Sequence, residues 1–334
     1  MSDRVELLAG EIDGSADALA ALLHELARHE RVGQVRAATK RGMPARVRFV
    51  GMGSSRFAAE LPARRLRAAG LDATAELASA FDAPSLDAST LLVAISNSGS
   101  TPEVVAAVSA ARAAGDAVLA VTNGLSSPLA TVTQAVLPLG DGPEASGIAT
   151  RSYRHTVALL DWMVDVLLDE PSEDRRAAVD ATRELLGSRS SWVADAADAL
   201  DGAELIHVVG GPEAHGTREQ AALMCREIAR IAALPMDAGD WLHVGLYTLW
   251  PGGRLVLFSG TPYDEAIART VRERNATLVA MGSKVDGADV HAPLPTAALA
   301  DPTIRAIVEP LVMESIALEL WRRTDARERP VADP

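Results

Sequence analysis

The stretch LLVAISNSGSTPEVVAAV, residues 91–108, places six small polar residues between an apolar run and a helical pattern. Pro102 suits the first turn of a helix, and Ser100 and Glu103 have capping-box spacing, so we expect a helix to begin here. Its free N–H groups favour an anion. A helix cap explains one or two of the hydroxyls but not all of them, so the pattern predicts an anion-binding loop. The further side-chain donors are Ser96, Asn97, Ser98 and Thr101.

A second turn of glycine and serine, GMGSS at 51–55, follows another apolar run. It resembles the start of a dinucleotide-binding fingerprint, and Glu76 could imitate the acid that binds the ribose. However, Arg56 stands where that motif needs its third glycine, and a lone G-x-G is weak evidence. We therefore expect Gly53 and Ser54 to open the same pocket as the anion-binding loop, from an adjacent strand.

Two titratable residues in the second half of the chain could move protons. Glu227 lies in the otherwise apolar run AALMCREIARIAAL (221–234), and His243 follows in MDAGDWLHVG (236–245). Surface helices carry charged residues routinely, and a histidine between two apolar neighbours is often structural. The pattern alone therefore leaves a structural role open for both residues.

The elements that must position these residues alternate between strand and helix. A helical pattern over 14–39, with Ser15 as N-cap, comes first. The expected strands are 47–55, 73–79, 91–96, 117–123 and 135–139. The expected helices are 56–70, 102–115 and 150–170. Strands that are apolar almost throughout are typical of a parallel sheet covered on both faces, where ligands bind at the carboxyl ends of the strands.

The second half repeats this plan. Residues 204–234 read as strand, Gly-rich turn and helix, like 47–70, and residues 254–283 correspond to 91–123. Such self-similarity at domain length indicates tandem copies of one fold rather than a solenoid. We predict an α/β protein of two tandem doubly wound, flavodoxin-like parallel-sheet domains after a leading helical segment. The predicted boundaries are 1–40, 41–170, a helical connector at 171–200, and 201–334.

Composition narrows the classes of function. The chain has 334 residues, 48% hydrophobic and 23% charged, with a net charge of -13 that would repel nucleic acid and anionic membranes. The acidic N-terminus lacks a signal-peptide pattern, and acidic residues interrupt the longer apolar stretches, so we expect a cytoplasmic protein. A single cysteine, Cys225, excludes an internal disulfide and a cysteine-cluster metal site.

Six motifs resemble the sugar isomerase, or SIS, domain family: GMGSS, AISNSGSTPE, AVTNGLSSPLA, GPEASGIATR (142–151), ALMCREI and AGDWLHVG. The run ISNSGSTPE is specific, since the family reads I-S-x-S-G-x-T-x-[DE]. The resemblance runs from about residue 45 to the C-terminus, in the tandem arrangement of the isomerase half of glucosamine-6-phosphate synthase. The glutaminase half of that synthase has no counterpart here, so we expect no release of ammonia from glutamine.

The resemblance implies a 6-phosphosugar site at a dimer interface. It implies that Glu227 shuttles a proton between C1 and C2, and that His243 helps to open the sugar ring from the neighbouring subunit. One carboxylate of raised pKa can serve both proton steps, and a partly apolar helix face would raise the pKa of Glu227. The substrate contacts that the resemblance implies are Gly53, Ser54, Ser96, Asn97, Ser98, Thr101, Thr150 and Arg226.

The departures from the family pattern bear on the chemistry. The synthase has a lysine where this chain has Arg226, and another near its C-terminus that forms an imine with the ketose. The two lysines here, Lys40 and Lys284, match neither position. Ala149 replaces a family serine, although Thr150 remains. We therefore expect no protein Schiff base, which favours a 6-phosphosugar whose own amine supplies the C=N unit.

The expected reaction is proton transfer at C1 and C2 coupled to release of an amine or ammonia, as in fructosamine-6-phosphate deglycases and aminosugar-phosphate deaminases. Simple aldose-ketose isomerisation is the first alternative. A phosphosugar sensor without catalysis is the second, although no DNA-binding segment is visible to accompany it. An NAD-type oxidoreductase is the third. We expect a homodimer with a shared active site and neither a metal nor a cofactor.

Overall fold

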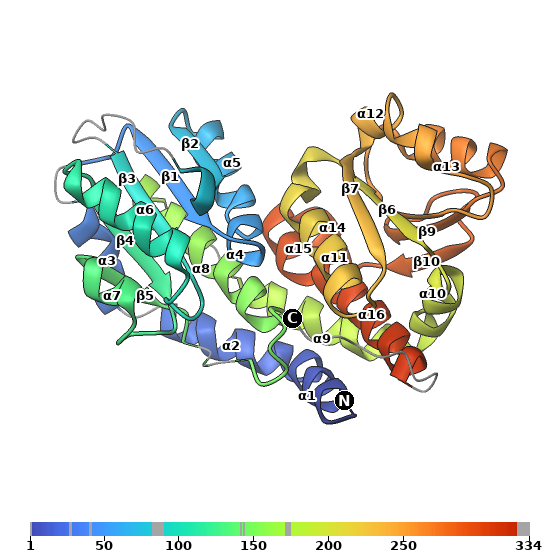
Figure 1. Cartoon of the computed structure of the whole chain (residues 1–334), viewed down its shortest axis with the longest axis horizontal. Helices are drawn as coiled ribbons and strands as arrows, with labels where there is room; N and C mark the ends of the chain where they lie inside the picture. Colours follow the sequence, from blue (N-terminus) through green and yellow to red (C-terminus); the bar gives the residue numbers. More distant parts are fainter. Residues whose placement is uncertain are drawn as a thin grey trace. The chain divides into compact units, whose positions relative to one another are not determined.

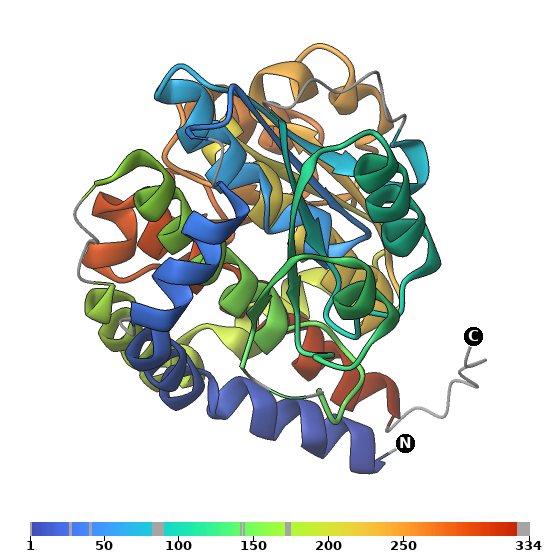
Figure 2. The same cartoon turned by 90° about the vertical axis from the view of Figure 1, so that its left-hand side faces the viewer.

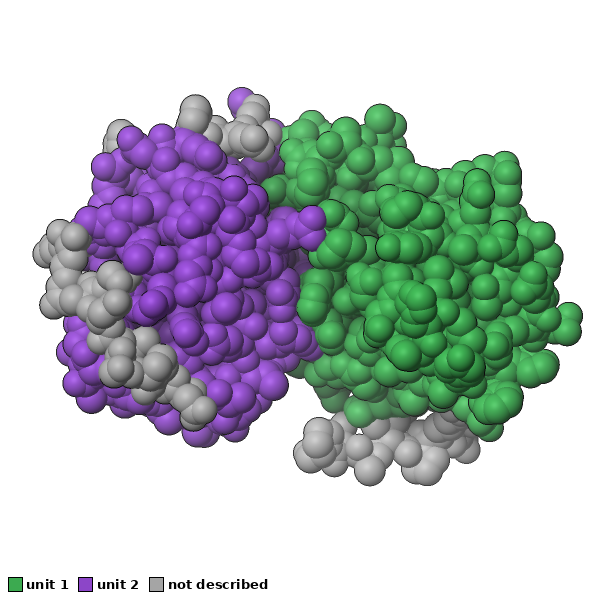
Figure 3. Space-filling view, turned by 90° about the horizontal axis from the view of Figure 1, so that it is seen from above, with its two compact units in different colours: residues 1–16, 145–150, 177–334 green, residues 17–144, 151–176 purple. Residues whose placement is uncertain are grey.

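A computed structural model describes residues 2–26, 29–39, 42–81, 90–140, 142, 144–170 and 175–325. The chain divides into two compact units, which Figure 3 distinguishes by colour. Unit 1 comprises Met1–Ala16, Ala145–Thr150 and Ala177–Pro334, and unit 2 comprises Asp17–Glu144 and Arg151–Arg176. Each unit contains one parallel sheet.

Unit 2 contains the first sheet. Its strands are β1 (Arg46–Gly51), β2 (Asp72–Leu77), β3 (Thr90–Ile95), β4 (Ala117–Thr122) and β5 (Ala135–Pro138). All pairs are parallel, and the order is β2-β1-β3-β4-β5. The accompanying helices are α2 (Ser15–Leu26), whose first two residues belong to unit 1, α3 (His29–Ala38), α4 (Ser54–Phe57), α5 (Glu60–Ala68), η1 (Ala78–Ala80), α6 (Pro102–Ala113), α7 (Pro128–Val132) and α8 (Arg151–Leu168).

The core of unit 2 lies on both faces of its sheet (Figure 1). Helices α6 and α7 cover one face, and α3, α5 and α8 contact one another or the sheet on the other. β3 is buried at every position, as expected for a central strand between two helical layers. The α6 face packs alternate strand residues against one stripe of the helix. This cluster includes Val50, Leu92, Ala94, Val118 and Ala120 with Val104, Ala107, Val108 and Ala111.

The helix expected at 56–70 is divided into α4 and α5. Pro62 lies in the first turn of α5, where its missing N–H is tolerated. In a continuous helix its ring would clash with the carbonyl of Ala58, which explains a break between Phe57 and Glu60. The single-helix prediction was therefore wrong at this point.

Unit 1 contains the second sheet. Its strands are β6 (Leu205–Gly210), β7 (Ala232–Asp237), β8 (Arg254–Phe258), β9 (Thr277–Gly282) and β10 (Val290–Pro293). The order is β10-β9-β8-β6-β7, again with parallel pairs. The helices are α1 (Ser2–Asp13), α9 (Arg176–Ser188), η2 (Arg189–Ser191), α10 (Val193–Leu200), η3 (Pro212–Ala214), α11 (His215–Glu227), α12 (Ala238–Trp241), η4 (Gly245–Thr248), α13 (Asp264–Glu273), α14 (Thr296–Ala300), α15 (Pro302–Val308) and α16 (Pro310–Asp325).

The two sheets share one strand order. Read in sequence within each sheet, both run 2-1-3-4-5, the flavodoxin-like arrangement. In unit 1, α12 and α13 pack on one face around the buried Trp241, and α10, α11 and α16 form a second helical layer. Helix α1 contacts α16. Figure 2 shows α1 lengthwise, in dark blue next to the N-terminus. The prediction of tandem α/β domains with N-terminal helices is confirmed.

The helix expected to run through residue 234 ends earlier. α11 stops at Glu227, and the chain then forms β7 from Ala232 to Asp237. Arg230 has φ +56, a left-handed conformation that cannot continue a right-handed helix. Glu227 therefore lies at the end of α11 rather than within it.

The compact units group the chain differently from the predicted boundaries. Residues 1–16 belong with the second sheet rather than with 17–40, and so do residues 145–150. Lys40 and the tail 326–334 lie outside the described residues. Within the described ranges, no helix combines the length and the apolar character needed to cross a membrane.

Candidate anion-binding site at the first sheet

The loops after β1 and β3 border the switch point of the first sheet. β1 and β3 are neighbours, but the chain leaves β1 toward β2 on one side and leaves β3 toward β4 on the other. In open parallel sheets this divergence opens a crevice at the carboxyl ends of the strands, where ligands bind. The predicted loop 96–101 and the turn 51–54 therefore follow neighbouring strands at the expected edge.

The hydroxyls of loop 96–101 are not used to cap α6. Thr101 is the N-cap residue but makes no side-chain cap hydrogen bond, so the capping box expected for Ser100 and Glu103 is wrong. Instead the Oγ1 of Thr101 lies 2.9 Å from the Oγ of Ser96, which also accepts a 3.1 Å hydrogen bond from the backbone N–H of Gly99. Ser98 is exposed. This leaves the first N–H groups of α6 without a side-chain acceptor, which suits an anion.

Residues at the end of the neighbouring strand β4 and directly after it hold this loop in place. The backbone carbonyl of Asn97 accepts hydrogen bonds from the N–H of Asn123 at 3.0 Å and from the Oγ1 of Thr122 at 3.1 Å. Its side-chain oxygen accepts a 2.6 Å hydrogen bond from the Nδ2 of Asn123. The sequence interpretation assigned no role to Thr122 or Asn123, although the polar turn VTNGLSS after β4 was a signal for them.

Gly99 fits where a side chain would not. Its φ is +68, and an added Cβ would lie 2.0 Å from the Oγ of Ser127 and 2.9 Å from the Oγ1 of Thr122. Its carbonyl accepts a 3.0 Å hydrogen bond from the N–H of Leu129 at the start of α7. Glycine thus lets the loop pack directly on the next turn.

The turn after β1 also depends on glycine. Gly53 has φ +50 and precedes α4, so Ser54 begins that helix. The acid considered for a ribose, Glu76, is already engaged by Arg48 at 2.8 Å and by the Oγ1 of Thr74 at 2.6 Å. These contacts give Glu76 a structural role, which argues against the dinucleotide interpretation.

The corresponding loop of the second sheet already contains an anion. The carboxylate of Asp264 accepts hydrogen bonds from the N–H of Gly260 at 2.7 Å and from the N–H of Thr261 at 3.2 Å. It also accepts a 2.6 Å hydrogen bond from the Oγ1 of Thr261. Since α13 begins at Asp264, this carboxylate takes the position that an external anion would need.

A pocket of 190 Å³ lies at the switch point of the second sheet, between the ends of β6 and β8. Its floor includes Glu309, which pairs with Arg305 at 2.6 Å and accepts a 2.9 Å hydrogen bond from Thr217. Burial raises the pKa of Glu309, against the opposing effect of Arg305. Neither Glu227 nor His243 lines this pocket.

Glu227 and His243 are both exposed. The expectation that a partly apolar helix face surrounds Glu227 does not hold, because α11 ends there and the side chain leaves the apolar stripe. The Nη1 of the adjacent Arg226 donates a 3.1 Å hydrogen bond to the carbonyl of Ala233. His243 follows α12, which Asp237 caps through the N–H of Gly239 at 2.9 Å.

The predicted residues are distributed between the units. Gly53, Ser54, Ser96, Asn97, Ser98 and Thr101 belong to unit 2, and Thr150, Arg226, Glu227 and His243 belong to unit 1. Thr150 is fully buried, and the carbonyl of Ala149 before it accepts a 2.7 Å hydrogen bond from the Nε2 of Gln220. In the described ranges, no cluster of three or more histidine, cysteine or acidic side chains could hold a metal ion.

Comparison with known proteins relates this chain to SIS-domain proteins. Residues 44–164 match the family model of the SIS domain. Glutamine–fructose-6-phosphate aminotransferase (isomerizing) of Tropheryma whipplei strain Twist is 26% identical over 308 residues, which cover 82% of this chain and 48% of that protein. The chain thus spans about half the length of this curated relative.

Two solved structures share the fold over nearly the whole chain. Tagatose-6-phosphate ketose/aldose isomerase from Escherichia coli superposes with a TM-score of 0.81 at 19% identity, covering 97% of this chain and 95% of that one. Glucosamine-6-phosphate deaminase from Thermotoga maritima gives a TM-score of 0.67 at 17% identity, with 91% and 94% covered. At these identities the likeness establishes the fold.

Proposed function

The chain is a SIS-domain protein, and from that premise we propose that it is a phosphosugar isomerase-type enzyme acting at C1 and C2 of an amine-bearing 6-phosphosugar. The observation that carries the proposal is the loop from Ser96 to Thr101. It presents the exposed hydroxyls of Ser98 and Ser100 beside the start of α6, which has no side-chain cap, on the crevice side of a parallel sheet. A sugar phosphate fits this loop, because phosphate accepts hydrogen bonds from backbone N–H groups and hydroxyls at once.

Glu227 supplies the proton transfer in this proposal. In a fructosamine 6-phosphate the amine is on C1 and the carbonyl is on C2. Glu227 removes a proton from C1 to give an enaminol and returns a proton to C2, which leaves a C=N bond at C1. Water then hydrolyses that bond, which releases the amine and an aldose 6-phosphate. The exposed position of Glu227 leaves its carboxylate accessible to such a ligand.

A homodimer with a shared site is part of the proposal. His243 lies beside exposed apolar side chains: Val244 is 53% exposed, Tyr247 67% and Trp250 69%. Exposed aromatic side chains are enriched at protein interfaces. We infer that this surface docks on a second copy of the chain and brings His243 to the sugar ring bound there.

Aldose-ketose isomerisation of a simple 6-phosphosugar is the second candidate. Neither Lys40 nor Lys284 matches a Schiff-base lysine of the family, and a carboxylate base needs no imine to move a proton between C1 and C2. The two candidates share the phosphate loop and Glu227. They differ in that only the amine-bearing substrate releases an amine, whereas simple isomerisation releases no group.

Solvent deuterium exchange tests the proposal. The substrates are fructose 6-phosphate, glucosamine 6-phosphate and a fructosamine 6-phosphate in D₂O, followed by NMR. We expect exchange at C1 or C2 and release of amine from an amine-bearing substrate, and we expect Glu227→Gln to bind substrate without exchange. Glu184→Gln, an exposed carboxylate on α9, is the matched control. Exchange by Glu227→Gln at the wild-type rate would refute the assigned base, and binding without exchange by the wild type would indicate a sensor.

A further inference from the structure

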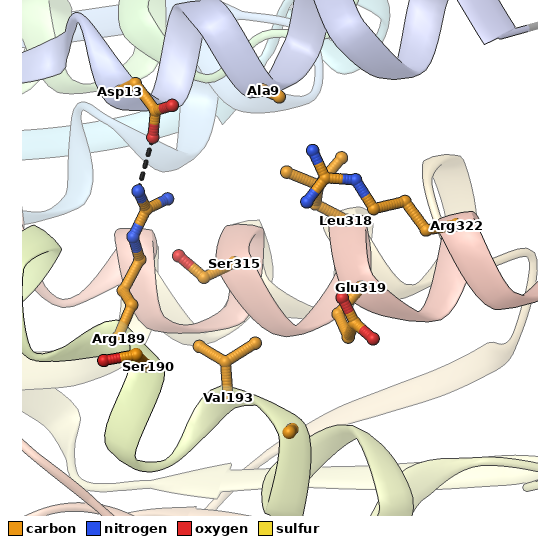
Figure 4. A pocket seen from close by; sticks show the side chains of 10 residues that line it. Ala9, Asp13, Arg189, Ser190, Val193, Ser315, Leu318, Glu319 and Arg322 are labelled. Atoms are coloured by element: carbon orange, nitrogen blue, oxygen red, sulfur yellow. Dashed lines mark hydrogen bonds and ion pairs between the residues drawn. The ribbon is translucent and has the colours of Figure 1, made fainter.

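Unit 1 has a second pocket, away from the carboxyl ends of its strands, whose volume is 330 Å³. Figure 4 shows that it lies among α1, the turn η2 with the start of α10, and α16. All three segments belong to unit 1, and none of the predicted catalytic or substrate-binding residues lines the pocket. It is therefore a separate site from the phosphate loop.

Ser315 gives the first indication of a ligand. Its side chain is 3% exposed, and its Oγ has no hydrogen-bond partner among the described residues. In Figure 4 this oxygen points from α16 along the pocket toward Arg189. A buried hydroxyl without a partner is unfavourable, so a ligand that accepts its hydrogen bond gains from the contact.

The charged side chains of the pocket give the second indication. The acids are engaged: Asp13 pairs with Arg189, and Glu319 accepts a 3.0 Å hydrogen bond from the Nε of Arg323. Arg322, in contrast, has only a loose ion pair, 3.7 Å from Glu6, and its side chain is 45% exposed. The uncommitted polar groups are therefore hydrogen-bond donors.

The start of α10 adds to this donor excess. Val193 and Ala194, the first residues of that helix, both line the pocket, and the N-cap residue Trp192 makes no side-chain cap hydrogen bond. A helix N-terminus favours negative charge. The remaining wall is apolar, formed by Ala9, Val193 and Leu318. The site thus combines donors for one anionic group with an apolar surface beside it.

We propose that this pocket binds a small organic anion, a monocarboxylate with a short branched apolar body. The carboxylate accepts hydrogen bonds from the Ser315 hydroxyl and the Arg322 guanidinium, and the apolar body lies against Leu318 and Val193. Such a ligand satisfies the buried hydroxyl and covers apolar surface in one step. The site does not depend on the function proposed above.

The test uses 4-methylpentanoate as the probe and methyl NMR of Leu318 and Val193 as the readout. We expect saturable shifts of both methyl signals with 4-methylpentanoate. Arg322→Gln weakens binding by about tenfold, since a charge-assisted hydrogen bond is lost, and Ser315→Ala weakens it several-fold. Arg183→Gln, which removes an exposed arginine of α9, is the matched control and leaves the affinity unchanged.

Two further probes separate the parts of the proposal. The uncharged 4-methylpentan-1-ol lacks the anion, and inorganic phosphate lacks the apolar body, so both bind more weakly than 4-methylpentanoate. The proposal is overturned if 4-methylpentanoate shifts neither methyl signal, or if the alcohol or phosphate binds equally well. It is also overturned if Arg322→Gln has no more effect than Arg183→Gln.

Discussion

Gly99 offers a sharp test of how the phosphate loop is held. Replacing it with alanine adds one methyl group at a position where φ is +68 and where the new Cβ would lie 2.0 Å from the Oγ of Ser127. Gly115 is a matched control, because its φ of +91 also disfavours alanine but its Cβ would meet no atom within 4 Å. Both substitutions place an alanine at a positive φ, and Gly99→Ala also creates a steric overlap.

The expected magnitudes follow from these two contributions. Left-handed backbone costs an alanine about 1–2 kcal/mol, which applies to both variants. Overpacking costs a further ~1–3 kcal/mol, and this cost applies to Gly99→Ala only. We therefore expect Gly99→Ala to lower the free energy of unfolding of unit 2 by about 1–3 kcal/mol more than Gly115→Ala does. The strain falls within loop 96–101, so binding of fructose 6-phosphate weakens as well.

Native-state hydrogen exchange of the amides in β3 and β4 is the appropriate assay, because a chain of two units need not unfold in one step. A double variant, Gly99→Ala with Ser127→Gly, removes the two nearest clashing atoms and should recover much of the loss. Ser127 caps α7 through the N–H of Ala130, but glycine is nearly as good a cap. Equal losses in the Gly99 and Gly115 variants, or no recovery in the double variant, would refute the steric argument.

Two further predictions concern buried ionisable side chains in unit 2. Arg175→Gln leaves Arg65 paired with both Asp161 and Asp165, whose side chains are 1% and 2% exposed, so one buried negative charge loses its compensation. We expect urea denaturation to show a loss of up to about 3–5 kcal/mol in the stability of the unit, against at most about 1 kcal/mol for the exposed Arg183→Gln. Equal losses in the two variants would contradict this. Burial lowers the pKa of His155 from 6.5 to about 3. As the pH drops below 6.5, the His155 imidazole therefore takes up a proton in the unfolded chain but stays neutral in the folded protein. The free energy of unfolding consequently falls between pH 6.5 and pH 3. The slope is at most about 1.4 kcal/mol per pH unit, and we expect it to vanish from the stability-against-pH curve of His155→Gln; an unchanged curve would count against it.

Much of the fold could be predicted because strand and helix periods alternate clearly. β3 was expected at 91–96 and runs over Thr90–Ile95, and α6 was expected at 102–115 and runs over Pro102–Ala113. Such segments carry their own signal in the spacing of apolar residues. The end of α11 carried none, since it depends on the left-handed conformation of Arg230, which is not a residue type that favours it.

The site was predictable in its residue types but not in its internal contacts. The hydroxyls identify the polar loop, yet the capping box expected for Ser100 and Glu103 does not form. Thr101 pairs with Ser96 instead, across five residues, and Asn97 is held from the neighbouring strand by Asn123. Those contacts depend on the three-dimensional course of the chain, which spacing in sequence does not describe. The apolar run around Glu227 likewise predicted a helix through residue 234, whereas α11 ends at Glu227 and its side chain is exposed.

The carboxylate of Asp264 has a consequence for stoichiometry. The two sheets have the same strand order, so duplication alone would give two equivalent anion sites per chain. In the second loop, however, the carboxylate of Asp264 already accepts hydrogen bonds from the N–H groups of Gly260 and Thr261, so it competes intramolecularly with any incoming phosphate. A titration with a phosphosugar should therefore saturate at one equivalent per chain at these loops, so the repeat gives the protein a second scaffold without a second copy of the ligand.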